Sequence, residues 1–338
     1  MKKELMVLIH LSMGFSSGCK GMALDFDREV WNNIVDKCVE CGYDAIVLDV
    51  SDGMKYKSHP EIADPNAWTR EEMTSEIHRL RDMGLKLYPK VNFSGMHDYW
   101  IKDYRKIRAT DEYRAFCKNI IEELYEVFEA PRYIHLGLDE EFPDRAKELG
   151  FRTGDVLFND YKFLINVVKE LGSTPMMWAS TCMHTMDVWE KHIPDDMIFA
   201  AGHYYEFEKE KWTKIADQAP WVQKYYWGGM FENRSLYKKY LERYGDTKIE
   251  YVEQDETVQM YMDFLEYIGE RNYKFYIITS NIFIDTNDRS SVEYYSKWKY
   301  KDNILGHFAL PWVRTNKANE KAILTEIETL AKAVKEFY

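Results

Sequence analysis

The feature that most constrains the fold of this chain is a series of short, nearly continuous apolar segments that recur from one end of the sequence to the other. A strand that is apolar at almost every position is buried on both faces, as parallel strands are when both sides of their sheet are covered. The sequence therefore predicts eight parallel strands, at residues 5–10, 45–50, 85–91, 133–139, 175–179, 197–202, 275–280 and 304–310.

Helical patterns fill the intervals between these segments. Residues 27–41 place Val30, Ile34 and Cys38 on one face, and Gly42 follows as a stop. Thr69-Arg-Glu-Glu72 has the residues of a capping box, which predicts the start of a second helix. Further apolar periodicities predict helices at about 116–127, 157–168 and 319–337.

Eight strands, each followed by a helix or a long loop, match a (β/α)8 TIM barrel, and we therefore predict an α/β fold in one domain over residues 1–338. The competing doubly wound sheet needs a glycine-rich phosphate-binding turn, and no Gly-x-Gly-x-x-Gly follows any predicted strand. The interval 206–272 between strands six and seven is too long for one connection. We expect it to form an inserted subdomain on the rim of the barrel.

The net charge limits the kind of binding partner, and the cysteine content indicates the redox compartment. A formal net charge of −12 argues against nucleic acid or an anionic membrane as partner. The five cysteines form no disulfide or zinc framework, so we expect buried thiols and a reducing compartment, the cytoplasm. Residues 1–10 are interpreted as the first strand and not as a signal peptide, and no segment has the length of a membrane span. The sequence leaves the oligomeric state open, and it indicates no cofactor.

Polar residues cluster where the predicted strands end, which is where barrel enzymes place their active sites. The strand ends carry His10, Asp49 with Asp52, Asn92 with His97, Asp139 with Glu140, Trp178, His203 with Tyr204, Asn281 with Asp285, and His307 with Trp312. Packing alone does not explain polar residues at nearly every strand end, whereas a ligand-binding site does.

The adjacent carboxyl groups of Asp139 and Glu140 are the strongest catalytic signal. If the fourth strand continues through residue 139, then His135, Gly137 and Asp139 share one of its faces, and Glu140 lies at the rim. Two carboxyl groups this close raise the proton affinity of at least one, which suits a general acid near neutral pH. The competing interpretation is a solvated loop that begins at Glu140.

The segment His135-x-Gly-x-Asp-Glu140 resembles the signature of family 20 glycoside hydrolases, the β-N-acetylhexosaminidases. The resemblance is best over residues 44–141, through Leu48-Asp-Val-Ser-Asp-Gly53 and Gly84-Leu-Lys-Leu-Tyr-Pro-Lys-Val-Asn-Phe-Ser-Gly-Met-His97. It returns at Ile304-Leu-Gly-His-Phe-Ala-Leu-Pro-Trp312, which is similar to the eighth strand of that family.

This resemblance implies a retaining exo-glycosidase that removes terminal β-linked N-acetylhexosamine, or a related amino sugar, by substrate-assisted catalysis. It assigns Glu140 as the general acid/base and Asp139 as the group that orients the 2-acetamido nucleophile. A nucleophile supplied by the substrate suits this pair, since adjacent residues cannot flank the anomeric carbon as acid and protein nucleophile. The residues expected to bind the sugar are His135, His97, Trp178, Tyr204, Asp285, Trp312 and Arg314.

The chain also departs from the family pattern around the sugar pocket. The usual arginine after strand one is absent from His10-Leu-Ser-Met-Gly14, and Phe283 stands where a tyrosine usually donates to the acetamide oxygen. Arg314 replaces an expected glutamate, and Asn92 replaces an aspartate. These changes predict a rebuilt pocket, for which Tyr204 or Tyr205 is the expected replacement donor and an anionic group could meet Arg314.

Two other functions remain open at the level of sequence. The altered pocket residues are compatible with a carbohydrate-binding barrel that has no turnover. A metal-dependent hydrolase would require His10, His135, His203 and His307 to converge with Asp139, but neither His-x-His nor His-Glu-x-x-His spacing occurs. We therefore predict no metal site.

Overall fold

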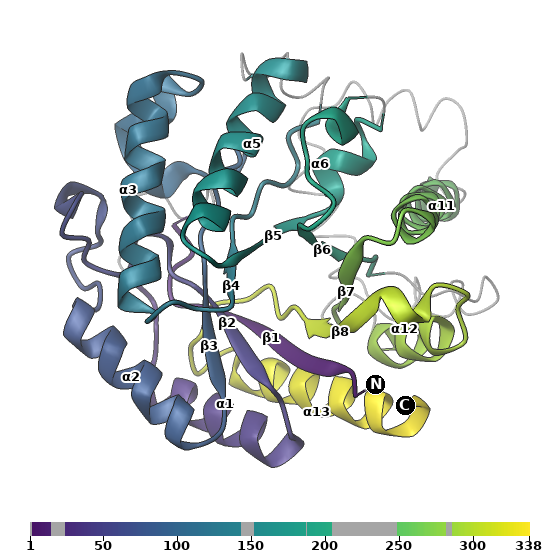
Figure 1. Cartoon of the computed structure of the whole chain (residues 1–338). Helices are drawn as coiled ribbons and strands as arrows, with labels where there is room; N and C mark the ends of the chain where they lie inside the picture. The colour runs from purple at the N-terminus through teal and green to yellow at the C-terminus, as the bar shows by residue number, and fades with distance from the viewer. Residues whose placement is uncertain (1, 15–23, 143–151, 187, 205–248, 282–285) are drawn as a thin grey trace.

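The computed structural model is a closed barrel of eight parallel strands in the order β1 to β8 (Figure 1), and it describes residues 2–14, 24–142, 152–186, 188–204, 249–281 and 286–338. Because β8 pairs in parallel with β1, the barrel closes as predicted. The strands are β1 (Glu4–His10), β2 (Ala45–Asp49), β3 (Lys86–Lys90), β4 (Tyr133–His135), β5 (Thr174–Trp178), β6 (Ile198–Ala201), β7 (Lys274–Thr279) and β8 (Ile304–Ala309).

Helices surround the strands and cover their outer faces (Figure 1). The last of them lies beside the first and closes the outer ring, with both chain termini on the same side of the molecule (Figure 1). The described helices are α1 (Arg28–Cys41), α2 (Arg70–Asp82), α3 (Asp111–Val127), α5 (Gly154–Glu170), α6 (Ser180–Met183), α11 (Ile249–Glu270), α12 (Asn287–Ser296) and α13 (Glu320–Phe337).

The local signals that predicted these helices act as expected. Asp27 caps α1 by accepting from the backbone N–H groups of Glu29 and Val30. Gly42 ends that helix in a left-handed conformation at φ 77°, which glycine adopts without strain. The capping box at the start of α2 is complete, with reciprocal bonds between Thr69 and Glu72.

Side chains alternate between two cores along each strand. One core lies between the sheet and the helices and contains, for example, Val7, Ile46 and Leu48. The other fills the barrel interior with large side chains such as Tyr88, Trp178 and Phe308. The barrel is therefore a packed core, and ligands can reach it only at its ends.

Two predictions about the elements need revision. The fourth strand ends at His135 and not at residue 139, because Gly137 and Leu138 take positive φ values of 74° and 65° that no strand accommodates. Residues 249–270 of the predicted insertion form α11, the barrel helix before β7, whose Phe264 and Ile268 are buried in the helix-layer core. Residues 206–248 of that insertion lie outside the described residues.

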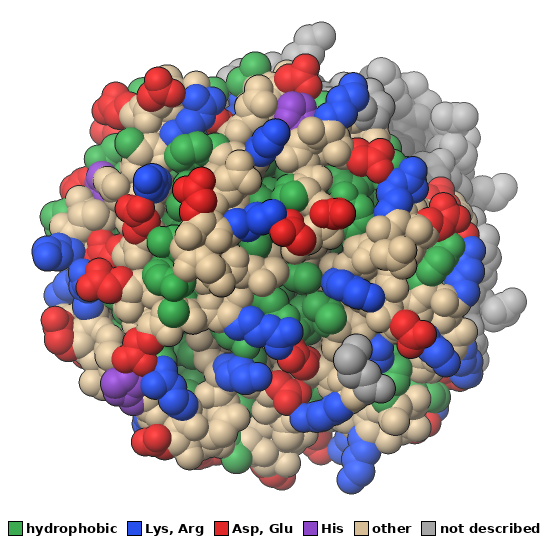
Figure 2. Space-filling model, viewed as in Figure 1, with side chains coloured by type: hydrophobic (Ala, Val, Ile, Leu, Met, Phe, Trp, Pro, Cys, Tyr) green, Lys and Arg blue, Asp and Glu red, His purple; other side chains and the backbone are tan. Residues whose placement is uncertain are grey.

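In the part of the chain that the structure describes, no helix combines the length and apolarity needed to cross a membrane. The face shown in Figure 2 carries acidic and basic side chains in alternation, without a broad field of one sign. Four cysteines are described as free thiols, and Cys38, Cys117 and Cys182 among them are buried.

Candidate active site

The floor of the site is a layer of polar side chains at the carboxyl ends of the first four strands. His10, Asp49, Lys90 and His135 are successive register partners across β1 to β4, so they face the barrel interior at one level. The ammonium of Lys90 lies 2.6 Å from Asp49 Oδ2, and both side chains are almost fully buried. Burial opposes the charge of Asp49, but the nearby Lys90 and His10 outweigh burial and hold the pKa of Asp49 well below its usual value.

A sharp turn after β4 carries the acidic pair over this floor. A Cβ atom at Gly137 would lie 2.2 Å from Asn92 Oδ1 and 2.7 Å from the Cα of Asn92, so no other residue fits the close approach of the two loops. Asn92 Oδ1 accepts from the backbone N–H of Leu138 at 3.2 Å. The glycine of the His-x-Gly-x-Asp-Glu segment is therefore required by the packing of the β3 loop against the β4 turn.

Asp139, Glu140 and His97 meet at the mouth of the barrel. His97 Nε2 lies 3.2 Å from Glu140 Oε2 and 3.7 Å from Asp139 Oδ2. The other Asp139 oxygen accepts a hydrogen bond of 2.8 Å from Asn92 Nδ2. The side chain of Glu140 is 37% exposed and that of Asp139 only 14%, so Glu140 is the carboxyl group more open to a bound molecule.

The electrostatics of this group follow from burial and proximity. Burial disfavours a charged His97, but the carboxylates of Asp139 and Glu140 outweigh burial and raise the pKa of the imidazole to about 9. Burial raises the pKa of Asp139, and the charge of Glu140 adds to the increase, while His97 and the Asn92 amide oppose it. At neutral pH the site therefore combines an imidazolium with two carboxyl groups.

The turn that bears the acids is held from the β5 side. The backbone N–H of Glu140, at φ 59°, donates to Ser180 Oγ at 3.1 Å. The backbone N–H of Glu141 donates to Thr181 Oγ1 at 3.2 Å. The hydroxyls at the start of α6 thus stabilise a backbone conformation that is unfavourable for glutamate.

Behind this turn, a buried ion-pair network anchors the side chain of Glu141. Glu141 Oε2 lies 3.4 Å from the guanidinium of Arg152 and accepts 2.7 Å from the hydroxyl of Tyr161. Arg152 also pairs with Asp160 at 2.7 Å and donates to the carbonyl of Phe93 at 2.8 Å. This network joins the turn that carries Glu140 to α5 and to the β3 loop, and it buries Glu141, which is therefore not a solvated loop residue.

Aromatic rings form one wall of the mouth. Trp178 lies against His135 at 4.2 Å between ring centroids and against Phe308 at 5.7 Å, and it is 4% exposed. Trp312 is only half-buried, 5.6 Å from Trp178 and 6.4 Å from the ring of Tyr204. Trp312 and Tyr204 are therefore accessible at the rim, while Trp178 lies deeper.

The protonation state of His135 can be deduced from its contacts. Burial and the nearby Lys90 lower its pKa far below the usual value, so the ring is neutral. Its Nδ1 accepts from the backbone N–H of Gly137 at 3.0 Å, which places the proton on Nε2. His135 thus supports the turn from below and is nearly inaccessible, at 1% exposure.

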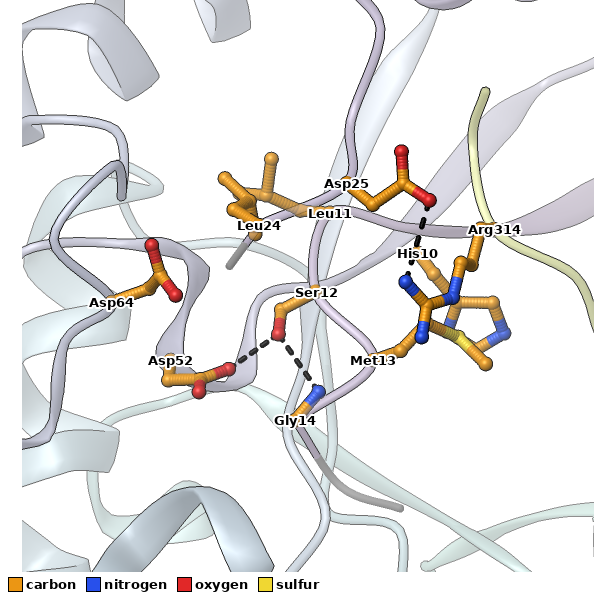
Figure 3. Close-up of a pocket in the computed structure, with 10 residues that line it drawn as sticks. All are labelled: His10, Leu11, Ser12, Met13, Gly14, Leu24, Asp25, Asp52, Asp64 and Arg314. Carbon is orange, nitrogen blue, oxygen red and sulfur yellow. Dashed lines mark hydrogen bonds and ion pairs between the residues drawn. The ribbon is translucent and has the colours of Figure 1, made fainter. Parts of the chain in front are cut away.

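Arg314 lies in a neighbouring pocket between the ends of β1 and β8 (Figure 3). Its guanidinium pairs with Asp25 at 3.3 Å. Asp52, which accepts from the hydroxyl of Ser12, and Asp64 line the same pocket. Among the described residues that line this pocket, three carry carboxyl groups (Asp25, Asp52 and Asp64) and one carries a guanidinium, so their charge does not favour the anionic sugar group that Arg314 had suggested.

Some predicted strand-end residues lie elsewhere. His307 faces the helix layer, 5.4 Å from the ring of Tyr338, and burial lowers its pKa to about 3. The ring of His203 lies 6.2 Å from Tyr261 of α11, also outside the barrel interior. The convergence of His10, His135, His203 and His307 with Asp139 that a metal-dependent hydrolase would require is therefore not what the structure shows for His203 and His307. Asp285, Phe283 and Tyr205 lie outside the described residues.

Among the described residues, one group has the spacing of metal ligands. Single ligand atoms of His97, Asp139 and Glu140 all lie within 4.8 Å of one another. The raised pKa of His97 means that a metal ion would have to displace its proton.

Sequence reasoning missed Lys90, Ser180 and Arg152 as parts of this site. The signal for Lys90 was available, since a lysine that ends an apolar strand needs a buried counter-ion. The contributions of Ser180 and Arg152 depend on loops that are distant in sequence, and no local pattern indicates them.

Comparison with known proteins shows what this fold is similar to. No family profile and no curated protein sequence matches the chain. Many solved structures do match, among them a β-N-acetylhexosaminidase from Bacteroides fragilis at 12% identity and a TM-score of 0.59, covering 97% of this chain and 65% of that one. Dispersin B matches at 10% identity and a TM-score of 0.57, with 99% of each chain covered.

A family 20 exo-β-N-acetylglucosaminidase from Vibrio harveyi, solved with N-acetylglucosamine, matches at 11% identity and a TM-score of 0.56, covering 99% of this chain. This chain spans only 56% of the Vibrio harveyi protein, and about two thirds of the Bacteroides fragilis one. The fold is therefore similar to that of these family 20 glycoside hydrolase structures, as the resemblance in sequence implied.

Proposed function

We propose that this chain is a divergent family 20 glycoside hydrolase, a retaining exo-glycosidase that acts on terminal β-linked N-acetylhexosamine or a related amino sugar. The observation that carries the proposal is the group of Asp139, Glu140 and His97 at the barrel mouth. Barrels of this type place catalysis at the carboxyl ends of the strands, and these three residues follow β3 and β4.

In the proposed reaction, the acetamide carbonyl oxygen of the substrate attacks the anomeric carbon as the bond to the leaving oxygen breaks. Glu140 gives its proton to that leaving oxygen, and it suits this role because it is the more exposed of the two acids. Water then opens the cyclic intermediate and returns a proton to Glu140. The configuration at the anomeric carbon is therefore retained, and the nucleophile comes from the substrate and not from the protein.

His97 and Asp139 have separate roles in this scheme. The imidazolium of His97, hydrogen-bonded to Glu140 at 3.2 Å, stabilises the carboxylate that remains after proton donation. Asp139 accepts from the acetamide N–H, and its charge stabilises the cationic intermediate. Trp312 and Tyr204 at the rim offer faces for the sugar ring.

The decisive test is a panel of aryl β-glycosides with and without a 2-acetamido group, together with a thiazoline mimic of the intermediate. We expect turnover of the 2-acetamido substrates and inhibition by the thiazoline. The Glu140→Gln variant should lose about 10²–10⁴-fold in turnover when the leaving group is poor. Equal activity on substrates that lack the acetamide, with no inhibition by thiazoline, would exclude substrate assistance.

A metal-dependent hydrolase is the second candidate, because His97, Asp139 and Glu140 have ligand spacing. Metal analysis of the purified protein, and assay after treatment with a chelator, separate the two. The glycosidase proposal expects no effect of the chelator.

A carbohydrate-binding protein without turnover would bind the thiazoline or the sugar but release no product from any substrate.

A further inference from the structure

The amide of Asn92 is fixed in one orientation by its surroundings. Its Oδ1 accepts from the backbone N–H groups of Ser94 at 3.1 Å and Leu138 at 3.2 Å. Only the NH2 end of the amide remains for Asp139, whose Oδ1 accepts from it at 2.8 Å. Since the side chain is 2% exposed, water cannot replace these bonds easily.

This contact has a chemical consequence because an amide cannot give up its proton in the physiological range. Asn92 Nδ2 donates at every pH, so Asp139 Oδ1 always meets a donor and can keep its charge. A carboxyl group in the place of the amide could donate only while it holds a proton. Two carboxylates at hydrogen-bond distance repel, and one of the pair then has a strongly raised pKa.

We propose that Asn92 is a positioning residue that aims Asp139 and favours its charged form through a donor that does not itself titrate, and so keeps the site working into neutral and alkaline conditions. The inference rests on the proposed function, in which Asp139 receives the acetamide N–H. It concerns a buried residue that acts through Asp139. Above this range the next group to titrate is His97, whose pKa the two acids raise to about 9.

The titratable groups around Asp139 come from each neighbouring element. His97 faces it from the β3 loop, Glu140 follows it in the same turn, and Lys90 at the end of β3 contributes a positive charge from below. None of these contacts changes when the amide of Asn92 becomes a carboxyl group of the same shape. A new titration in such a variant therefore belongs to the altered pair.

The test is the Asn92→Asp variant, which keeps the acceptor for both backbone N–H groups. We expect near wild-type kcat at low pH, where the shared proton lets the new carboxyl donate as the amide does. As that proton is lost, kcat should fall about tenfold per pH unit, well before the wild-type enzyme declines. KM should change little, because substrate binding in the ground state does not use this contact.

Two controls make the outcome specific. The Asn66→Asp variant adds the same charge at an exposed position and should keep the wild-type profile. The Asn92→Leu variant removes the donor and should lower kcat at all pH values without a new titration. A merely structural role for Asn92 would give Asn92→Asp a uniform loss across pH, and that result would overturn the proposal.

A second readout separates this inference from the proposed function. The free energy of unfolding of Asn92→Asp, measured by urea at pH 4 to 9, should fall relative to wild type as pH rises. The reason is that the folded pair binds its proton more tightly than the unfolded chain does. If the wild type hydrolyses no glycoside, the proposed function fails, but these unfolding curves still decide the inference: parallel curves would overturn it.

Discussion

Removal of the Arg152 guanidinium should destabilise the protein far more than the loss of a surface ion pair. The side chains of Arg152 and Glu141 are 2% and 0% exposed, so neither charge is solvated when its partner is removed. In Arg152→Met, Asp160 keeps the guanidinium of Arg114 at 2.9 Å, whereas the hydroxyl of Tyr161 is the one side-chain partner that Glu141 keeps among the described residues. The unpaired charge in this variant is therefore that of Glu141.

Breaking a buried ion pair in this way costs about 3–5 kcal/mol. At about 2.1 cal/mol/K of unfolding entropy per residue, 338 residues correspond to about 0.7 kcal/mol/K, so Tm should fall by about 4–7 °C. The assays are urea unfolding followed by tryptophan fluorescence, and calorimetry for Tm. Because the network anchors the turn that carries Glu140, turnover should also fall.

The double variant Arg152→Met with Glu141→Gln provides the internal check. A neutral glutamine at position 141 no longer carries a buried charge, so the double variant should recover a large part of the loss in the single variant. A single-variant loss below about 1 kcal/mol, as for exposed pairs, or strictly additive losses, would refute the reasoning that Glu141 is a charge in need of Arg152.

The remaining predictions concern pH and the rim. The pKa of His97 is about 9 in the folded protein and about 6.5 in the unfolded chain. The charged imidazole therefore stabilises the folded state fully below about pH 6.5, and this stabilisation is lost as pH rises through 9. The alkaline decline in kcat near pH 9 should vanish in His97→Gln. Burial raises the pKa of Asp288 to about 6 and, together with Asp288, raises that of the neighbouring Glu326 well above its usual value, so the stability that depends on Asp288 falls as pH rises from about 4 to 6 and that of Glu326 falls further at higher pH. Glu326→Gln should then raise the free energy of unfolding at pH 8 by about 1–2 kcal/mol and change it little at pH 5, which urea titrations at both values would check. Trp312→Leu should raise KM for aryl glycosides about three- to tenfold with kcat nearly unchanged, and a drop in kcat alone would count against ring stacking.

Local physical rules determined much of the fold. Strands buried on both faces read as apolar runs, and capping residues such as Asp27 and Thr69 mark helix starts. Those signals act within a few residues, so one sequence predicts eight strands, their order and the acidic pair after the fourth. The closure of β8 on β1 then follows from the strand count and the right-handed connection of parallel strands.

What the sequence could not determine is how loops distant along the chain meet. The fourth strand ends at His135 and the chain turns at Gly137, where Asn92, from another loop, occupies the space that a side chain would need. The same approach sets the hydrogen bond from Asn92 to Asp139, and the hydroxyl of Ser180 sets the backbone at Glu140. The identities of His135, Asp139 and Glu140 could be read locally, but their orientations and charges depend on contacts between loops that only the closed barrel brings together.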